Sequence, residues 1–422
     1  MGEKVRIGKC ELIVFMGGMN AMPMMYALEL KKLGFDVLYF VDAAPRDMLS
    51  RPENHYPEIS YPYPEWVIEK RLFSQLLLPL FPRFSAYYYR WCIYRLTGRK
   101  KCVFILNGFF SSLSPFLFSA SRKIALSHGS DLDVWGNTKG VDGLIAGFKK
   151  RSFFRFLPTP VAARVIKMIV GRQYEGYRQS DAVLYFPKGF NSAGDTVLQS
   201  LVDEGVQYIS RHDISDEPLK RCTRTFKEPG AVLEIFSGVR FLFETFPNGN
   251  PGYNKGNDVI IKGLALYYSR NKNIRIHFVS KGEDVDAAKA LCGKLGIDAA
   301  VVWHDEMKLS ELLALYQASD ICFDQVGAQW IGAVGGYALW LGKPLIANDA
   351  SLVGSGVWPK ENPICSASTA QAVCDWLVKL ENIGLRREVA EESKRFVEAH
   401  MMPGSVLQKL FDVGVSQHDQ RC

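Results

Sequence analysis

Residues 11–42 read ELIVFMGGMNAMPMMYALELKKLGFDVLYFVD, and this stretch decides the fold. ELIVFM is a short apolar run typical of a buried strand, GGMNAMP is a turn, and MMYALELKKLG has the apolar spacing of a helix. FDVLYFVD is a second strand-like run. A strand, a glycine-rich turn, a helix and a strand within about 30 residues predict a βαβ unit and a parallel sheet.

The same pattern recurs along the rest of the chain. In the first half the further strand-like runs are CVFILNG (102–108), KIALSHG (123–129) and DAVLYFP (181–187). In the second half they are AVLEIFSG (231–238), IRIHFVSKG (274–282), VVWHD (301–305), ICFDQ (321–325) and PLIAND (344–349). We therefore expect an α/β protein with two Rossmann-like, doubly wound parallel-sheet domains facing a central cleft. Functional groups are expected at the carboxyl ends of the strands.

The composition shifts predict where these domains begin and end. The boundaries that we expect are an N-terminal domain at 1–214, a polar linker at 215–230, a C-terminal domain at 231–385 and a helical tail at 386–422. The tail is expected to pack back on the N-terminal domain.

Composition limits the classes of protein. Of 422 residues, 48% are hydrophobic and 23% charged, which is a globular composition. The net charge of +7 is too small to indicate a nucleic-acid binder, so no nucleic-acid partner is expected. Nine scattered cysteines without a C-x-x-C pair indicate reduced thiols in a cytosolic compartment.

Membrane insertion is not expected. The charged segment Met1–Cys10 does not resemble a signal peptide, and the uncharged run Val103–Ala120 is interrupted by Asn107, Gly108 and Pro115. The sequence therefore predicts a cytoplasmic protein, soluble or peripheral on the inner face of the cytoplasmic membrane.

Basic and aromatic residues are mixed in two stretches. Residues 70–130 contain ten Lys or Arg and no Asp or Glu, and residues 148–178 contain eight basic residues against Glu175 alone. Such a mixture suits the anionic surface of a cytoplasmic leaflet, which predicts peripheral membrane contact through 70–101 and 148–178. The alternative is ordinary helices with solvated basic side chains and aromatic rings in the core.

Two candidate sites follow strands of the first half. Gly17 and Gly18 come directly after the first strand, where glycines let a ligand approach the backbone and the next helix offers free N–H groups. His128, in SHGSD (127–131), ends a predicted strand, where an imidazole can hydrogen-bond a sugar hydroxyl. A plain turn and a structural histidine are the alternatives.

Two more candidate sites belong to the second half. Arg240 follows its first strand and Lys255 precedes its first helix, so two cations beside a helix N-terminus predict a diphosphate site that also stabilises a departing phosphate. The segment GAQWIGAVGGYALWLGKP (327–344) has glycines that predict a helix beginning near Gly336, and this turn would admit a ribose and phosphate. Solvated charges and a tightly packed glycine turn are the alternatives.

The order of these elements resembles the retaining GT-B glycosyltransferases of the family-4 type (glycosyl transferases group 1). SHGSD resembles their His-Gly segment, SGVR followed by KGNDVIIKGLAL their donor-phosphate elements, and ASDICFDQ with IGAVGGYALWLGKPLIAND their late glycine-rich block. The resemblance implies an acceptor-binding first domain and a nucleotide-sugar-binding second domain. The implied catalytic residues are His128, Arg240 and Lys255. The implied donor-binding residues are Gly238, Gln329, Gly332, Gly335, Gly336 and Tyr337, and the implied acceptor-binding residues are Gly17, Gly18, Asn20 and Asp131.

The sequence departs from this family where two glutamates usually stand eight positions apart. Here those positions hold Gln329 and Tyr337, which are uncharged. No metal is expected, since the DLD at 131–133 matches a divalent-metal motif only in its letters. No cofactor is expected either, because the nucleotide sugar is a substrate.

The function implied is a glycosyltransferase (EC 2.4 type) that moves a sugar from a nucleoside-diphosphate sugar to a saccharide or lipid-linked acceptor, with retention. Envelope polysaccharide biosynthesis, of lipopolysaccharide, O-antigen or capsule, is the expected setting. One alternative is a GT-B sugar-nucleotide epimerase, although Gly335, Gly336 and Tyr337 offer no carboxylates for its proton chemistry. The other alternative is a non-catalytic GT-B scaffold, suggested by the missing glutamate pair.

Overall fold

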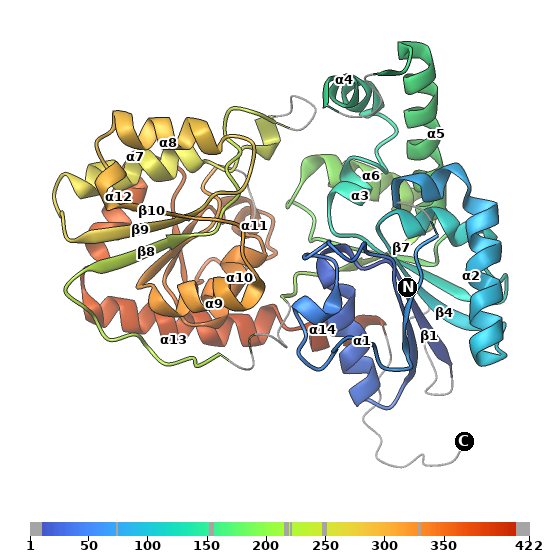
Figure 1. The fold of residues 1–422 in the computed structure, drawn as a ribbon. Helices are drawn as coiled ribbons and strands as arrows, with labels where there is room; N and C mark the ends of the chain where they lie inside the picture. Colours follow the sequence, from blue (N-terminus) through green and yellow to red (C-terminus); the bar gives the residue numbers. More distant parts are fainter. Residues whose placement is uncertain are drawn as a thin grey trace. The chain divides into compact units, whose positions relative to one another are not determined.

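The computed structural model describes residues 11–72, 75–151, 156–214, 219, 222–246, 251–327 and 331–410. The chain divides into two compact units, the first comprising Met1–Pro187, Ser192–Arg211 and Pro403–Cys422, and the second Lys188–Asn191 and His212–Met402 (Figure 1). Among the described residues, no helix combines the length and the apolar character needed to cross a membrane.

The first unit is built on a seven-stranded sheet of order β3-β2-β1-β4-β5-β6-β7, in which every neighbouring pair is parallel. Its strands are β1 (Leu12–Met16), β2 (Asp36–Val41), β3 (Val67–Glu69), β4 (Cys102–Asn107), β5 (Arg122–Leu126), β6 (Ala182–Tyr185) and β7 (Gln207–Ser210). Its helices are α1 (Pro23–Lys32), α2 (Pro82–Thr97), α3 (Ser130–Asp133), α4 (Val141–Arg151), α5 (Thr159–Arg178), α6 (Ser192–Asp203) and α14 (Pro403–Leu410), with 3-10 turns η1 (Met19–Ala21), η2 (Pro52–Asn54), η3 (Gln75–Leu80) and η4 (Gly108–Phe116).

The apolar run of β1 is continuous because both faces of the sheet are covered. Ile13 and Phe15 lie in one core with residues of α1 and α14, while Val14 and Met16 point into another core with residues of α2 and η4. Successive side chains of a strand alternate between faces, so a strand covered on both faces needs apolar residues at every position.

The second unit has a six-stranded parallel sheet of order β10-β9-β8-β11-β12-β13. Its strands are β8 (Leu233–Ser237), β9 (Ile274–Val279), β10 (Val301–His304), β11 (Ile321–Phe323), β12 (Leu345–Ala347) and β13 (Ile364–Ser366). Its helices are α7 (Asn257–Tyr268), α8 (Val285–Lys294), α9 (Leu309–Ala318), α10 (Ala333–Trp340), α11 (Ala350–Gly354), α12 (Ala370–Lys379) and α13 (Ile383–His400), with 3-10 turns η8 (Pro251–Tyr253) and η9 (Asp298–Ala300). The two parallel sheets confirm the predicted α/β class with two Rossmann-like halves.

The structure differs from the sequence prediction at α10. This helix begins at Ala333 and not near Gly336, so Gly335 and Gly336 lie inside it. The predicted boundary at residue 385 falls within α13, which belongs to the second unit, whereas α14 belongs to the first.

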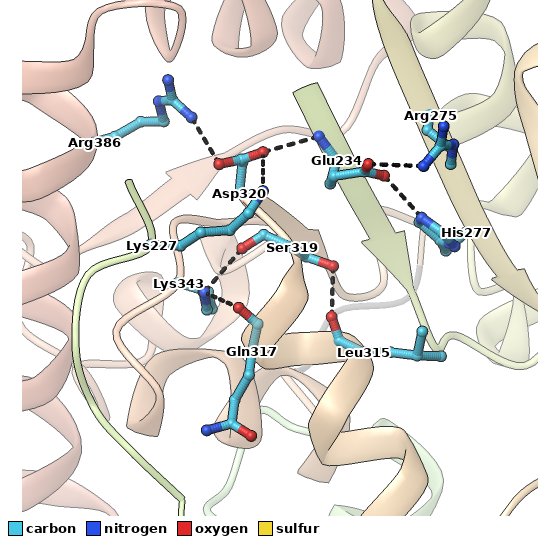
Figure 2. Close-up of polar contacts among 10 residues, drawn as sticks. All are labelled: Lys227, Glu234, Arg275, His277, Leu315, Gln317, Ser319, Asp320, Lys343 and Arg386. Carbon is cyan, nitrogen blue, oxygen red and sulfur yellow. Dashed lines mark hydrogen bonds and ion pairs between the residues drawn. The ribbon is translucent and has the colours of Figure 1, made fainter. Parts of the chain in front are cut away.

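A buried carboxylate ties three segments of the second unit together at the amino end of β11 (Figure 2). Asp320, whose side chain is 2% exposed, accepts hydrogen bonds from Lys227 Nζ at 2.7 Å and the Glu234 N–H at 2.9 Å. It also forms an ion pair with Arg386 of α13 at 3.2 Å. Beside it, buried Lys343 donates to the carbonyls of Gln317 and Ser319, both at 2.8 Å. Through Lys227, the Glu234 N–H and Arg386, Asp320 therefore fixes residues 222–230, β8 and α13 around one strand end.

We expect Asp320→Ala to lower the free energy of unfolding by about 3–5 kcal/mol, because Arg386 would remain buried without its carboxylate. Urea denaturation measures the change. Glu391→Gln is the control, since it breaks only the exposed pair of Glu391 with Lys394 and should cost less than about 1 kcal/mol. Equal effects of the two substitutions would contradict this role for Asp320.

Candidate functional site

The first unit has its topological switch point between β1 and β4, the position where open parallel sheets bind ligands. Gly17 follows β1 with φ 91°, and a Cβ there would lie 2.5 Å from the carbonyl oxygen of Asn107 at the end of β4. Only glycine permits this close approach. Gly18 is also buried, and a Cβ there would lie 3.2 Å from Ser50 O and from the Tyr39 hydroxyl.

The turn between β1 and α1 has a strained backbone. Asn20 and Ala21 both have positive φ, at 54° and 53°. Asn tolerates this conformation, but Ala does so only at a cost of about 1–2 kcal/mol. The Asn20 side chain is exposed and Ala21 is buried. Strain of this kind clusters at functional sites, and contact of Asn20 with an acceptor stays a prediction.

Asn107 joins three strand ends and was not foreseen from the sequence. Its Oδ1 accepts a hydrogen bond from the Met19 N–H at 2.8 Å, and its Nδ2 donates to the Leu126 carbonyl at 2.8 Å. The loops after β1, β4 and β5 are therefore held together by one buried amide. An Asn-Gly pair directly after an apolar strand was the available signal.

The segment that follows β5 is fixed by Asp131. Its Oδ1 accepts from the Ser127 hydroxyl at 2.7 Å and from the His128 N–H at 3.0 Å. Burial raises the pKa of Asp131, and the Ser127 hydroxyl and the His128 N–H oppose that shift. Asp131 is buried and holds the turn beneath His128, which is a positioning role; contact with an acceptor stays a prediction.

The imidazole of His128 is kept neutral by its surroundings. Burial, and then the charge of Arg211, lower the pKa of His128 well below its usual range. Arg211 Nη1 lies 3.4 Å from His128 Nδ1, and the guanidinium of Arg211 lies 5.4 Å from the centre of the Phe186 ring. A neutral imidazole can accept a hydrogen bond from a hydroxyl or donate one to it without adding charge. Arg211, 1% exposed and directly after β7, was also missed, although its place after a strand was a signal.

In the second unit, the switch point lies between β8 and β11. Arg240 follows β8, is exposed, and makes no side-chain hydrogen bond or ion pair in the described part of the chain. Two residues later, the Leu242 carbonyl accepts from the Lys255 N–H at 2.8 Å, and the Leu242 N–H donates to Asn257 Oδ1 at 3.1 Å. These bonds place the segments that contain the two predicted cations side by side.

Lys255 is directed toward the end of β11. Its Nζ donates to Gln325 Oε1 at 2.7 Å, and its carbonyl accepts from the Val326 N–H at 3.2 Å. Gly256, which precedes α7 with φ 72°, packs so closely on Gly327 that a Cβ would overlap its backbone nitrogen. The half-buried ammonium therefore lies at the carboxyl edge of the sheet, beside the N-terminus of α7.

Asp324 is a third site residue that the sequence analysis did not single out. It is buried, and its Oδ2 accepts from the Gly332 N–H at 2.6 Å and the Gly335 N–H at 3.0 Å at the N-terminus of α10. Burial raises the pKa of Asp324, while these backbone donors and the charge of Lys255 oppose the shift. A carboxylate at a helix N-terminus is favourable, and here it satisfies donors that were predicted to meet the nucleotide.

The remaining donor-binding candidates surround α10. A Cβ on Gly238 would lie 3.5 Å from Val334, so the end of β8 lies against the first turn of this helix. A Cβ on Gly336 would overlap the Ile214 side chain, which gives this glycine a packing reason of its own. Burial raises the pKa of Tyr337 to about 12, so its hydroxyl is neutral. Gln329 lies outside the described residues.

Within each unit the structure brings predicted residues together at one sheet edge. In the first unit, Asn107 joins the turn after Gly17 to Leu126, two residues before His128. In the second, the Lys255 N–H bonds to the carbonyl of Leu242, two residues after Arg240, and the Gly332 N–H bonds to Asp324. The first edge offers a neutral imidazole and an amide beside the Arg211 guanidinium, and the second offers cations and helix N-termini. The predicted meeting of His128 with Arg240 and Lys255 involves both units and stays a prediction.

Comparison with known proteins supports the fold only. No family model and no curated protein matches this chain in sequence. Among solved structures, Anabaena HepE in complex with UDP and glucose is 12% identical, with a TM-score of 0.55 over 95% of this chain and 98% of that one.

Two further solved structures are similar at the same level. WaaG, a glycosyltransferase involved in lipopolysaccharide biosynthesis, is 14% identical, with a TM-score of 0.50 over 96% of this chain and 100% of that one. A putative UDP-N-acetylglucosamine 2-epimerase from Listeria monocytogenes is 10% identical, with a TM-score of 0.51 over 92% of each chain. With its two Rossmann-like parallel-sheet units, the chain has the GT-B type of fold.

The neutral His128 makes a testable contribution to pH dependence. In the unfolded chain this residue binds a proton near pH 6.5, whereas the folded protein keeps its pKa well below that value. The unfolded state therefore binds more protons below about pH 6.5, and stability falls as the pH drops through this range. We expect His128→Gln to reduce the loss of unfolding free energy between pH 7.5 and 5.5 by about 1 kcal/mol, measured by urea denaturation. An unchanged pH dependence would contradict the buried neutral imidazole.

Proposed function

We propose that this protein is a glycosyltransferase that moves a sugar from a nucleoside-diphosphate sugar to a saccharide or lipid-linked acceptor. The observation that carries the proposal is the pairing of the Arg240 and Lys255 segments at the carboxyl edge of β8 and β11, beside the N-terminus of α7. Two cations at such an edge suit a diphosphate, because Arg can bind two oxygens and the helix adds N–H donors.

In the proposed reaction, the two cations and His128 have different roles. Arg240 and Lys255 bind the diphosphate and stabilise its negative charge as the bond between the sugar carbon and the phosphate oxygen breaks. Lys255 would exchange its bond to Gln325 Oε1 for a phosphate oxygen. In a reaction with retention, the acceptor oxygen bonds to the sugar carbon on the face that the phosphate leaves, and the departing phosphate oxygen takes the proton of the acceptor hydroxyl. His128, held neutral, would hydrogen-bond a hydroxyl of the donor sugar.

The finer assignments are proposals of the same kind. The loop that contains Gly17, Gly18 and Asn20 is proposed to contact the acceptor, and Gly238, Gln329, Gly332 and Tyr337 to surround the donor. Because Asp324 already binds the N–H groups of Gly332 and Gly335, the donor would rely chiefly on the cations and on α7. The half-buried phenol of Tyr337 offers one hydroxyl where two ribose hydroxyls must be bound.

The setting proposed is envelope polysaccharide biosynthesis in the cytoplasm, at the inner face of the cytoplasmic membrane. WaaG, which has a similar fold, takes part in lipopolysaccharide biosynthesis, and HepE was solved with UDP and glucose. These likenesses at 12–14% identity support the fold, and the cation pair supports the donor class.

A sugar-nucleotide epimerase is the second candidate, favoured by the similar fold of the Listeria protein. It needs proton donors and acceptors in the late glycine-rich segment, where Gly335, Gly336 and Tyr337 stand. Incubation with a UDP-sugar alone separates the two functions, because an epimerase needs no acceptor. A scaffold without turnover would give neither product.

We expect one member of a panel of UDP-, GDP-, dTDP-, ADP- and CMP-linked sugars to raise the melting temperature, since a ligand of the folded state stabilises it by mass action. Arg240→Ala and Lys255→Ala should each weaken binding of that sugar at least about tenfold, because each removes a charged hydrogen bond to phosphate. Isothermal titration calorimetry measures the affinities.

Lys262→Ala is the matched control for this experiment. Lys262 lies on α7 and pairs with Asp258 at 2.7 Å, so it provides a cation on the same helix without a place at the sheet edge. Its substitution should leave affinity unchanged. If no sugar nucleotide binds, or if all three variants bind equally well, the proposed donor site is wrong.

A further inference from the structure

Helix α2 has two apolar faces, and only one of them is covered. Ala86, Tyr89, Cys92 and Ile93 point into the core of the first unit. On the remaining surface, an aromatic stripe with spacings of three, four and three residues is open to solvent. Its members are Phe84, Tyr87, Trp91 and Tyr94, exposed by 57%, 67%, 52% and 47%. Figure 1 shows α2 as an outer helix of its unit. Four neighbouring aromatic side chains that are about half exposed or more on one helix face form an apolar patch that indicates an interaction surface.

Two cations lie beside rings of the aromatic stripe, and a third lies beside a neighbouring ring. Arg95 lies 6.0 Å from the centre of the Trp91 ring and Lys100 lies 5.1 Å from that of Tyr94. Arg83, also exposed, lies 5.5 Å from the Phe116 ring. No Asp or Glu occurs between residues 70 and 130 to neutralise them.

Two other basic residues of this stretch have acidic partners and are therefore not counted among the cations that could bind a partner. Arg99 pairs with Asp36 at 3.0 Å, and Lys101 pairs with Glu11 at 3.8 Å. In the described part of the chain, Arg83, Arg95 and Lys100 form no ion pair, and Arg95 and Lys100 lie beside rings of the aromatic stripe.

A hollow adjoins the N-terminal end of this helix. Its volume is about 460 Å³, and apolar groups of η3, α2 and η4 form most of its lining: Leu80, Phe81, Pro82, Phe84, Pro115 and Phe116. Arg83, Arg172, Ser112 and Glu175 complete the lining, and the Glu175 carboxylate is already paired with Arg178 at 2.6 Å. Arg172 donates to the carbonyls of Pro79 at 2.8 Å and Leu80 at 2.7 Å, which fixes η3 against α5 and keeps the hollow formed. An apolar cavity with guanidinium groups matches a lipid, which has acyl chains and a phosphate.

We propose that the aromatic stripe of α2, with the adjoining hollow, binds the surface of an anionic phospholipid bilayer. Tyr and Trp favour the level of the lipid headgroups, where their rings are apolar and their polar atoms remain hydrated. The unpaired cations complement anionic headgroups, and a helix with an exposed apolar face lies in the plane of the interface. The hollow would receive part of one phospholipid at the same surface.

This proposal assigns the membrane contact predicted from the sequence to a smaller set of residues. Of the two stretches 70–101 and 148–178, the first supplies the stripe, and the second contributes Arg172 to the hollow. Residues 152–155 and the side chains of 148–151 lie outside the described residues. The proposal does not rest on the transferase function, since vesicle binding and donor binding are measured separately and either can fail alone.

Co-sedimentation of the full chain with vesicles tests the proposal. Phosphatidylcholine vesicles and vesicles containing about one third phosphatidylglycerol are compared at low and high salt. We expect binding only to the anionic vesicles, weakened by salt because the attraction to the surface is electrostatic. The double variant Tyr87→Ser/Trp91→Ser should bind at least about tenfold more weakly, and Arg83→Gln/Arg95→Gln should lose most of the preference for anionic vesicles.

Leu266→Ser is the matched control, because Leu266 is exposed on α7 of the second unit and its loss should leave vesicle binding unchanged. All of these substitutions are at exposed positions, and unchanged circular dichroism and melting temperature confirm that the fold persists. Equal binding to both kinds of vesicle, or stripe variants that bind like the wild type, would overturn the proposal. A concentration-dependent dimer abolished by Trp91→Ser would also overturn it, because the stripe would then contact a second copy.

Discussion

The candidate donor site depends on one buried carboxylate. Asp324 follows β11 and accepts the N–H groups of Gly332 and Gly335, so the charge of a single side chain holds the N-terminus of α10 at the edge of the sheet. Its neighbour Gln325 accepts the bond from Lys255 Nζ. The ammonium that we assign to the diphosphate and the N-terminus of α10 are therefore held by two adjacent residues that directly follow β11. Because all strands of the sheet are parallel, their carboxyl ends lie at this one edge, and the site has a defined place.

In the first unit, the neutral side chain of Asn107 holds neighbouring strand ends together. Asn107 joins the loops after β1, β4 and β5 through its amide, where the second unit uses a carboxylate and an ammonium. His128 next to it is neutral, and the turn at Asn20 presents a polar side chain on a strained backbone. Neutral amide and imidazole groups suit the hydroxyl groups of a sugar, and the cations of the second unit suit a diphosphate. The roles of acceptor and donor domain remain predictions.

Sequence analysis predicted most of the fold because the central strands are strongly apolar. Strands such as β1, β4 and β8 are buried on both faces or nearly so, and the apolar runs that this requires are visible in the sequence. The strands β3, β7 and β13 were not predicted. They lie at the edges of the sheets and include polar residues that are only partly covered, so they lack the continuous apolar run of the central strands. The start of α10 was placed three residues late because Gly335 and Gly336 suggested a turn. In the structure these glycines instead admit Asp324 and Ile214 close to the helix.

The site was predicted only in part. His128 and Arg240 stand out in the sequence because they lie beside glycines after predicted strands. Asn107 and Arg211 contact residues 19 to 88 positions away, and Asp324 acts through its burial, and a linear pattern records neither property.

The most direct test of the central claim is a crystal structure of the protein grown with UDP. The account predicts the diphosphate at the carboxyl edge of β8 and β11, with oxygens within hydrogen-bond distance of Lys255 Nζ and the Arg240 guanidinium, and with the ribose toward the first turn of α10. UDP bound elsewhere, or bound at this edge with both cations directed away from its phosphates, would contradict it.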